Sequence, residues 1–132
     1  MSEPAIYRQL ADTARAAAEK AYAPYSNYFV GAALLTEDGQ VFTGCNVENK
    51  VFGGSICAER TALVKAVSEG HRSFKAIAVH CKNGEGWPCG VCRQFLLEFG
   101  PQTVVIVESG DGNLICRSIA ELLPEIPSAV RV

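Results

Sequence analysis

Cys57-Ala58-Glu59-Arg60 and, about thirty residues later, Pro88-Cys89-Gly90-Val91-Cys92 are the stretches that decide how this chain folds. Together they supply three thiolates, and thiolates select zinc among the common protein metals. A structural zinc site normally closes with four protein ligands, whereas a catalytic site keeps three and leaves the fourth position to water. Cys57, Cys89 and Cys92 make three ligands, and Glu59 remains to carry protons. The pattern therefore predicts a catalytic zinc centre.

Further motifs extend along most of the chain. In order they are Pro24-Tyr25-Ser26, Val30-Gly31-Ala32-Ala33, Gly44-Cys45-Asn46-Val47-Glu48-Asn49 and Cys57-Ala58-Glu59-Arg60-Thr61-Ala62. With Pro-Cys-x-x-Cys downstream, the chain resembles the small zinc-dependent cytidine deaminases from about residue 22 to 124. The resemblance implies hydrolytic deamination of cytidine or deoxycytidine to uridine or deoxyuridine plus ammonia, in pyrimidine salvage. It also implies one Zn²⁺ per subunit, a homotetramer, and a three-layer α/β/α fold with a mixed five-stranded sheet.

Glu59 is the expected catalytic residue. In the reaction that the resemblance implies, water activated by zinc attacks C4 of cytosine. Glu59 takes the water proton, protonates N3 and later carries a proton to the departing ammonia. Three thiolates make the site negative, so a positive group should compensate. Arg60 and Arg93 are both candidates, and the resemblance favours Arg60 as the residue that hydrogen-bonds the sulfurs.

Substrate contacts are predicted around the zinc centre. Asn46 and Glu48 stand two apart at a strand end, so their side chains point to one side and could bind the same hydroxyl. In the family that they resemble, this pair holds the ribose. The family usually has Phe where this chain has Tyr28, and either Tyr28 or Phe29 could stack on the base. The backbone N–H of Ala58 is a candidate partner for a pyrimidine carbonyl or for the bound water.

Phe52-Gly53-Gly54 departs from the family pattern, in which Tyr and Leu commonly stand at positions 52 and 54. Losing a large side chain next to the metal could open the pocket toward the leaving amine, and Phe-x-Gly-Gly also resembles blasticidin S deaminase. The alternative function is therefore deamination of a bulkier or N4-substituted cytosine nucleoside. Residues 123–127 lack the aromatic that in the family often reaches a neighbouring subunit's site. The tetramer is still expected, but that stacking contact has no residue to make it.

Composition bounds the class of protein. The 132 residues are 48% apolar and 20% charged, which fits one globular domain over residues 1–132. No apolar run approaches the roughly 20 residues of a membrane span, and the start lacks a secretory signal. A net charge of -2 without a basic stripe argues against a nucleic acid polymer as partner. The expected partner is a small-molecule cytosine nucleoside, and the expected location is cytoplasmic.

Six cysteines without a signal peptide fit a reducing compartment better than a disulfide framework. Cys45, Cys81 and Cys116 lie in or beside β-like runs, and we expect them to pack as small apolar side chains. A non-catalytic structural zinc module is the remaining alternative to an enzyme. The number of protein ligands on the metal discriminates between the two.

Hydrophobic periodicity predicts an α/β protein. Helical spacing predicts helices over 4–21, 57–69, 90–99 and 118–123, and apolar alternation or continuous apolar runs predict strands over 29–36, 40–46, 74–81, 103–107 and 113–116. This order predicts a mixed sheet between helical layers. Cys57, Cys89 and Cys92 then fall at helix starts, where the helix dipole favours thiolates.

Overall fold

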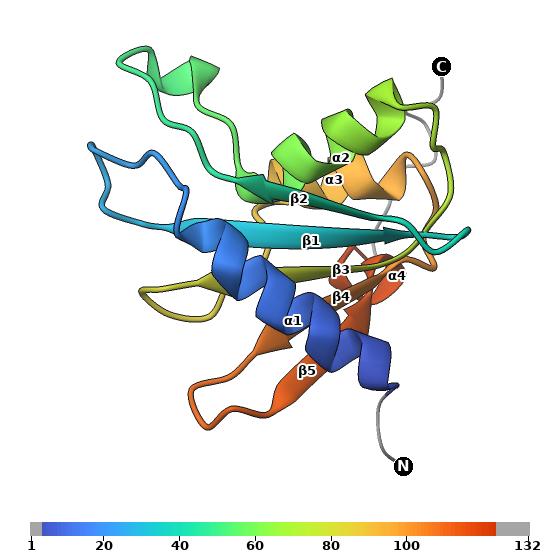
Figure 1. The fold of residues 1–132 in the computed structure, drawn as a ribbon. Helices are drawn as coiled ribbons and strands as arrows, with labels where there is room; N and C mark the ends of the chain where they lie inside the picture. Colours follow the sequence, from blue (N-terminus) through green and yellow to red (C-terminus); the bar gives the residue numbers. More distant parts are fainter. Residues whose placement is uncertain (1–3, 124–132) are drawn as a thin grey trace.

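The chain folds around a five-stranded sheet (Figure 1). The computed structural model describes residues 4–123. Its helical elements are α1 (Ala5–Ala18), the 3₁₀ turn η1 (Phe52–Gly54), α2 (Ala58–Ser68), α3 (Gly90–Leu97) and α4 (Ile119–Leu122). Its strands are β1 (Val30–Thr36), β2 (Val41–Cys45), β3 (Phe74–Cys81), β4 (Val104–Glu108) and β5 (Leu114–Ser118).

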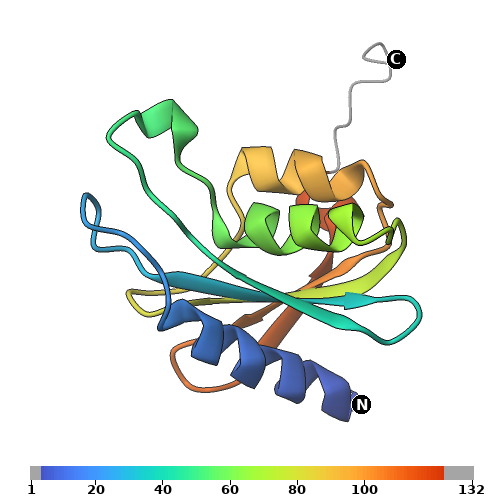
Figure 2. The same cartoon turned by 45° about the horizontal axis from the view of Figure 1, so that its top comes forward.

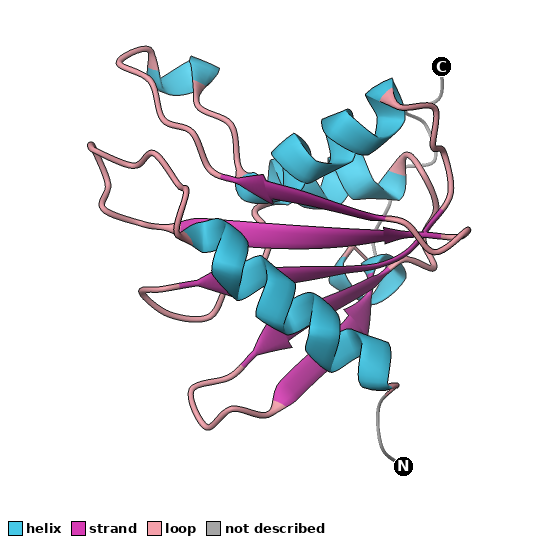
Figure 3. Cartoon of the chain, viewed as in Figure 1, coloured by secondary structure: helices cyan, strands magenta, loops and turns pink. Residues whose placement is uncertain are grey.

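The strand order is β2-β1-β3-β4-β5. β3 and β4 run parallel and the other neighbouring pairs are antiparallel, so the sheet is mixed. α3 supplies the crossover that a parallel pair requires. α1 covers one face of the sheet, and α2 and α3 lie side by side on the other (Figures 2 and 3). The predicted three-layer α/β/α fold with a mixed five-stranded sheet is confirmed.

Both faces of the central strands are buried, which explains their nearly continuous apolar sequence. On β1, Ala32 and Leu34 pack with α2 and α3, whereas Ala33 and Leu35 pack with α1. These four side chains are at most 6% exposed. Successive side chains of β1 therefore pack alternately into two hydrophobic cores, one on each side of the sheet.

Gly31 and Gly44 bring the two helical layers close to the sheet. A Cβ added at Gly31 would lie 2.1 Å from a backbone oxygen of α1, and one at Gly44 would lie 2.5 Å from the carbonyl oxygen of Ala58 in α2. Any side chain at these positions would push the helices away. Gly44 therefore sets the position of the start of α2, where the Cys-x-Glu pattern lies.

Glu108 ties α1 to the end of β4. Its carboxylate accepts hydrogen bonds from Arg8 at 3.0 Å and from Arg15, and its side chain is 13% exposed. Burial acts to raise the pKa of this carboxyl, but the hydrogen bonds and charges of Arg15 and Arg8 outweigh it and hold the pKa below its usual value. The ion pairs of Glu108 with Arg8 and Arg15 therefore help to hold α1 against the sheet at neutral pH.

The observed elements follow the predicted ranges closely except at the end of the first helix. α1 ends at Ala18 because the chain then turns to pair with the segment after β2. The Tyr22 N–H donates to the carbonyl of Asn46 at 2.9 Å, and the Tyr22 carbonyl accepts from the N–H of Glu48 at 2.8 Å. The prediction for residues 124–127 lies outside the described residues. Within residues 4–123, no helix is long and apolar enough to cross a membrane.

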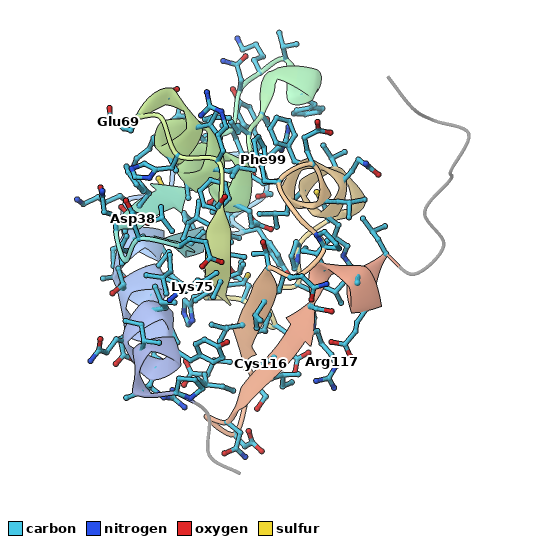
Figure 4. All side chains as sticks on the ribbon, turned by 90° about the vertical axis from the view of Figure 1, so that its right-hand side faces the viewer. Asp38, Glu69, Lys75, Phe99, Cys116 and Arg117 are labelled. Carbon is cyan, nitrogen blue, oxygen red and sulfur yellow. The ribbon has the colours of Figure 1, made fainter. Side chains whose placement is uncertain are left out.

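None of the six cysteines, all of which lie within the described residues, forms a disulfide. Cys81 is buried, and Cys45 and Cys116 are half-buried. Cys116 on β5 packs with the apolar cluster beneath α1, whereas its neighbour Arg117 is exposed (both labelled in Figure 4). The packing role expected of Cys116 agrees with this position.

Candidate functional site

Three thiols meet where α2 and α3 begin. Cys57 is the N-cap of α2, Cys89 is the N-cap of α3, and Cys92 lies in the first turn of α3. The Cys89 sulfur is 3.8 Å from that of Cys57 and 3.6 Å from that of Cys92, and all three lie within 4.8 Å of one another. The two helices start side by side at one end of the sheet (Figure 2). The fold therefore gathers the three predicted ligands into one cluster.

This cluster has the dimensions of a zinc site. In a tetrahedral site with Zn–S bonds of about 2.3 Å, neighbouring sulfurs lie about 3.8 Å apart, close to the separations of 3.6 and 3.8 Å seen here. The N–H groups at both helix starts present partial positive charge to the sulfurs. Within residues 4–123, no fourth His, Cys, Asp or Glu joins the cluster. Three protein ligands and an open position suit a catalytic site rather than a structural one.

Arg60 faces the sulfurs, and Arg93 does not. The Arg60 guanidinium donates a hydrogen bond to the Cys57 sulfur at 3.5 Å. Hydrogen bonds with Cys92 and then with Arg60 lower the pKa of Cys57 to about 5, while the hydrogen bond with Cys57 and then burial raise the pKa of Cys92. Arg93 instead donates to two backbone carbonyls. The structure therefore favours Arg60 between the two candidates for charge compensation.

Glu59 is a buried carboxylic acid beside the thiols. It is 4% exposed and lines the same cavity as Cys57 and Cys89. Burial raises its pKa to about 7, and the negative charge of Cys57 adds to the effect. A carboxyl with a pKa near neutrality can both take up and release a proton, as general acid–base catalysis requires.

A cavity of about 360 Å³ opens beside Glu59, within the size range of small-molecule sites. Its wall combines the start of α2, the segments flanking the ends of β1 and β2, and the loop between β3 and α3. The lining residues are Ser26, Tyr28, Val30, Asn46, Glu48, Cys57, Ala58, Glu59, Cys81, Glu85, Gly86, Trp87 and Cys89.

Asn46 and Glu48 reach this cavity together, but several of their polar atoms already have partners. The Asn46 side-chain amide donates to the carbonyl of Tyr28 at 2.7 Å, and its oxygen accepts from the N–H of Val30 at 3.0 Å. The Glu48 carboxylate accepts one hydrogen bond from the Ser26 hydroxyl and another, at 3.1 Å, from the backbone N–H of Ser26. The hydrogen bond with the Ser26 hydroxyl lowers the pKa of Glu48. The two side chains therefore support the cavity wall as well as forming part of it.

Comparison with known proteins decides the family. Residues 5–108 match the family described as "Cytidine and deoxycytidylate deaminase zinc-binding region". The chain belongs to this deaminase family. Zinc is accordingly its metal cofactor, in agreement with the dimensions of the thiol cluster.

Relatives in sequence and structure cover most of the chain. A probable cytidine deaminase of Dictyostelium discoideum is 50% identical over 115 residues, which cover 86% of this chain and 78% of that protein. A cytidine deaminase of Mycobacterium tuberculosis strain H37Rv is 42% identical over 122 residues, 90% of this chain and 87% of that protein. The crystal structure of cytidine deaminase from Burkholderia pseudomallei has a TM-score of 0.84 at 48% identity, over 95% of this chain and 98% of that chain.

The structure separates Tyr28 from Phe29. Tyr28 lines the cavity, whereas Phe29 is not among the lining residues and its ring centroid lies 5.8 Å from the ammonium of Lys82. Tyr28 is therefore the aromatic side chain of this loop that can meet a ligand. Ala58 also lines the cavity, and its N–H belongs to the first turn of α2, where helical N–H groups have no partner within the helix.

The structure contradicts the expectation that Gly54 lies next to the metal. Residues 52–54 form the 3₁₀ turn of a loop that projects from one end of the sheet, and none of them lines the cavity (Figure 1). Among the described residues, a Cβ added at Gly54 would meet only the Cβ of Val51, at 4.0 Å. Phe52 is 74% exposed and packs edge-on against the ring of Tyr25. This loop leads away from the thiols before it returns to Cys57, so it does not widen the pocket of its own chain.

Cys81 is a cavity residue that the sequence predicts only as packing. It follows Ile77 and Val79 on the side of β3 that packs with α2 and α3, and its side chain reaches the cavity. The alternation of side chains along β3 indicates which face Cys81 points to, because a residue two positions beyond Val79 points to the same face as Val79. Glu85 and Gly86 come from an irregular loop and have no comparable sequence signal.

Proposed function

We propose that this chain hydrolyses cytidine and deoxycytidine to uridine and deoxyuridine with release of ammonia, as a step of pyrimidine salvage. The main support is the buried Glu59 carboxyl, which lies with the thiol cluster at the wall of a cavity of about 360 Å³. Within residues 4–123, the cavity lining carries the carboxylates of Glu48, Glu59 and Glu85 and no Lys or Arg. A neutral nucleoside suits this charge better than a phosphorylated nucleotide does.

Cys57, Cys89 and Cys92 are the proposed ligands, and zinc, when bound, supplies a Lewis acid that lowers the pKa of a water molecule. Glu59 takes one proton from that water and delivers it to N3 as the C4–O bond forms. It then transfers the second water proton to the amino group, the C4–N4 bond breaks, and ammonia leaves. Arg60 offsets the charge of the thiolates through its hydrogen bond with Cys57.

The remaining site residues are proposed to bind the nucleoside. Asn46 and Glu48 hold the ribose, and Tyr28 packs against the base. Glu48 accepts three hydrogen bonds within the chain, and a carboxylate has about four acceptor positions, so one position remains for a ribose hydroxyl. The N–H of Ala58 binds the pyrimidine carbonyl or the reacting water.

The proposal is tested by ammonia release from cytidine, deoxycytidine, cytosine and an N4-substituted cytidine. Glu59→Gln keeps the shape of the side chain but cannot carry protons, so kcat should fall by about three orders of magnitude or more. Zinc content should stay near that of the wild type. Glu69→Gln, at the exposed end of α2, is the matched control and should retain full turnover. Near-normal turnover by Glu59→Gln would refute the assignment.

We also propose that the chain forms a homotetramer. Among the described residues, exposed apolar side chains include Val51 and Phe52 in the loop that projects from the sheet. They also include Val91 and Phe95 on α3, at a groove of about 550 Å³. Clustered apolar side chains of this kind commonly mark association surfaces. Light scattering should give about four times the chain mass of 14.1 kDa, and Phe95→Glu should lower the measured mass.

The remaining assignments rest on the sequence. Residues 1–132 are proposed to form one deaminase domain in the cytoplasm, where reduced thiols fit the absence of disulfides among the described cysteines. The proposed partner is the nucleoside, and neither a membrane nor a nucleic acid polymer is expected to bind.

A further inference from the structure

The three thiols of the metal cluster are held in place to different degrees. Cys92 is fully buried in the first turn of α3, and Cys57 accepts a hydrogen bond from Arg60 at 3.5 Å. Cys89 is exposed, and its sulfur contacts the sulfurs of the other two. Because Cys89 is the N-cap of α3, the place of its side chain depends on how the peptide between Pro88 and Cys89 is held.

Arg93 holds that peptide. Its Nε–H donates to the carbonyl of Pro88 at 2.8 Å, in a partly buried hydrogen bond. Pro88 is less than 2% exposed, so a water molecule has little room to replace the guanidinium. Since a peptide group is planar, holding the Pro88 carbonyl also holds the N–H and the Cα of Cys89.

The same guanidinium reaches α4. Its Nη1 donates to the carbonyl of Leu122, the last residue of α4, at 3.2 Å. Carbonyls in the last turn of a helix have no partner within the helix, and Arg93 supplies one. α4 is itself fixed in place, because Ile119 is fully buried and Ser118 and Glu121 form a capping box at its start. Arg93 therefore connects the approach to α3 with a helix that is anchored in the core.

We propose that Arg93 is a positioning residue of the metal centre, which sets the place of the Cys89 sulfur by holding Pro88 against α4. The inference rests on the ligand assignment made in the proposed function. Arg93 directly follows Cys92 in α3, and its planar guanidinium carries donors in fixed directions that suit two separate carbonyls. A sulfur that is already in place does not have to be ordered when zinc binds, and this preorganisation strengthens binding.

Zinc affinity tests the proposal. Arg93→Ala should lower the affinity about tenfold or more, as expected for a group that orients a metal ligand. The measurement is competition with chelators of graded affinity, at a temperature where circular dichroism shows that the variant is folded. In the cobalt-loaded variant the sulfur-to-cobalt absorption should change in position or intensity, because the Cys89 sulfur is less well placed.

Two further variants separate positioning from charge and from general stability. Arg93→Lys keeps the positive charge but replaces the planar fork by a single point donor, so it should recover less than half of the lost binding free energy. Arg72→Ala is the matched control, because Arg72 also donates to two backbone carbonyls, at 2.8 and 3.0 Å, but beyond the end of α2 opposite to Cys57. It should leave the zinc affinity and the cobalt spectrum unchanged. Wild-type affinity in Arg93→Ala would overturn the proposal, and so would full recovery by Arg93→Lys, which would assign the effect to charge alone.

A double-mutant cycle shows which ligand Arg93 acts through. Cys89→Ser replaces one thiolate by a weaker ligand and should lower the zinc affinity by itself. If Arg93 acts through Cys89, adding Arg93→Ala to the Cys89→Ser variant should cause a much smaller further loss than Arg93→Ala causes in the wild type. Additive losses would overturn the proposal.

The same measurements distinguish failure of the inference from failure of the proposed function. If the wild type binds zinc but releases no ammonia from cytidine, the proposed reaction is wrong, and the zinc affinities still decide the role of Arg93. If Cys89→Ser binds zinc as tightly as the wild type, the ligand assignment is wrong and the inference falls with it. If Cys89→Ser weakens binding but Arg93→Ala does not, the inference alone is refuted.

Discussion

Replacing Gly44 by alanine tests how closely the metal centre depends on the packing of α2 against β2. The added Cβ would lie 2.5 Å from both the carbonyl oxygen of Ala58 and the backbone nitrogen of Ala62. Ordinary contacts between such atoms begin at about 3.5 Å, so the helix and the strand must separate by roughly 1 Å. Overpacking of this kind costs about 1–3 kcal/mol of folding free energy, and we expect a lower melting temperature.

The same separation would move Cys57 and Glu59 relative to α3, which carries the other two thiols. A misplacement of about 1 Å in a catalytic site can cost about 10²-fold in rate, so kcat should fall by one to two orders of magnitude and zinc should be lost more readily to a chelator. Gly110→Ala is the matched control, because a Cβ at that exposed glycine meets no atom of residues 4–123 within 4 Å. Circular dichroism, metal analysis and ammonia release measure the three effects. Wild-type values of all three in Gly44→Ala would refute the reasoning.

Three further predictions concern single side chains. Arg60→Ala removes the donor to the Cys57 sulfur, so zinc affinity should fall about 10- to 100-fold. On acidification, zinc should dissociate at a higher pH than from the wild type, because protons then compete better for the thiol. A colorimetric chelator measures the zinc released. Glu108→Gln should cost about 1 kcal/mol at neutral pH. Because the folded-state pKa of Glu108 lies below its ordinary 4.5, the stability difference is present above that pH and disappears as the pH falls through the folded-state pKa, which urea unfolding across pH will show. Asn46→Ala should raise KM for cytidine and also cost about 1–3 kcal/mol in thermal unfolding, since two backbone groups lose their partners.

The secondary structure could be predicted well because its signals are local. β3 occupies the predicted range 74–81, since its apolar alternation is bounded by a polar loop on each side. The first helix was predicted too long because helical spacing continues to Ala21, whereas the chain leaves the helix earlier so that Tyr22 can pair with Asn46 and Glu48. That pairing joins segments more than twenty residues apart, and no local pattern contains it.

The glycines also show the difference between what local sequence predicts and what only the packed structure reveals. Gly31 and Gly44 stand within sequence motifs, but only the packed layers show that each lies under a helix backbone that a Cβ would strike. Gly54 was expected beside the metal because it stands three residues before Cys57. The loop leads away instead, because its turn at residues 52–54 projects from the sheet.

By itself the sequence determined the chemistry available to this protein: three soft ligands, an acid two residues after the first of them, and the order of helices and strands. These follow from residue types and short-range spacing, which are written directly in the chain. The tertiary structure decided which side chains share the cavity: it includes Tyr28 but not Phe29, leaves out Gly54 and adds Cys81. It also decided that Arg60, and not Arg93, lies against the sulfurs. Those choices depend on how distant segments pack, because a side chain's neighbours in space are set by the sheet order and the helix contacts rather than by its neighbours in sequence.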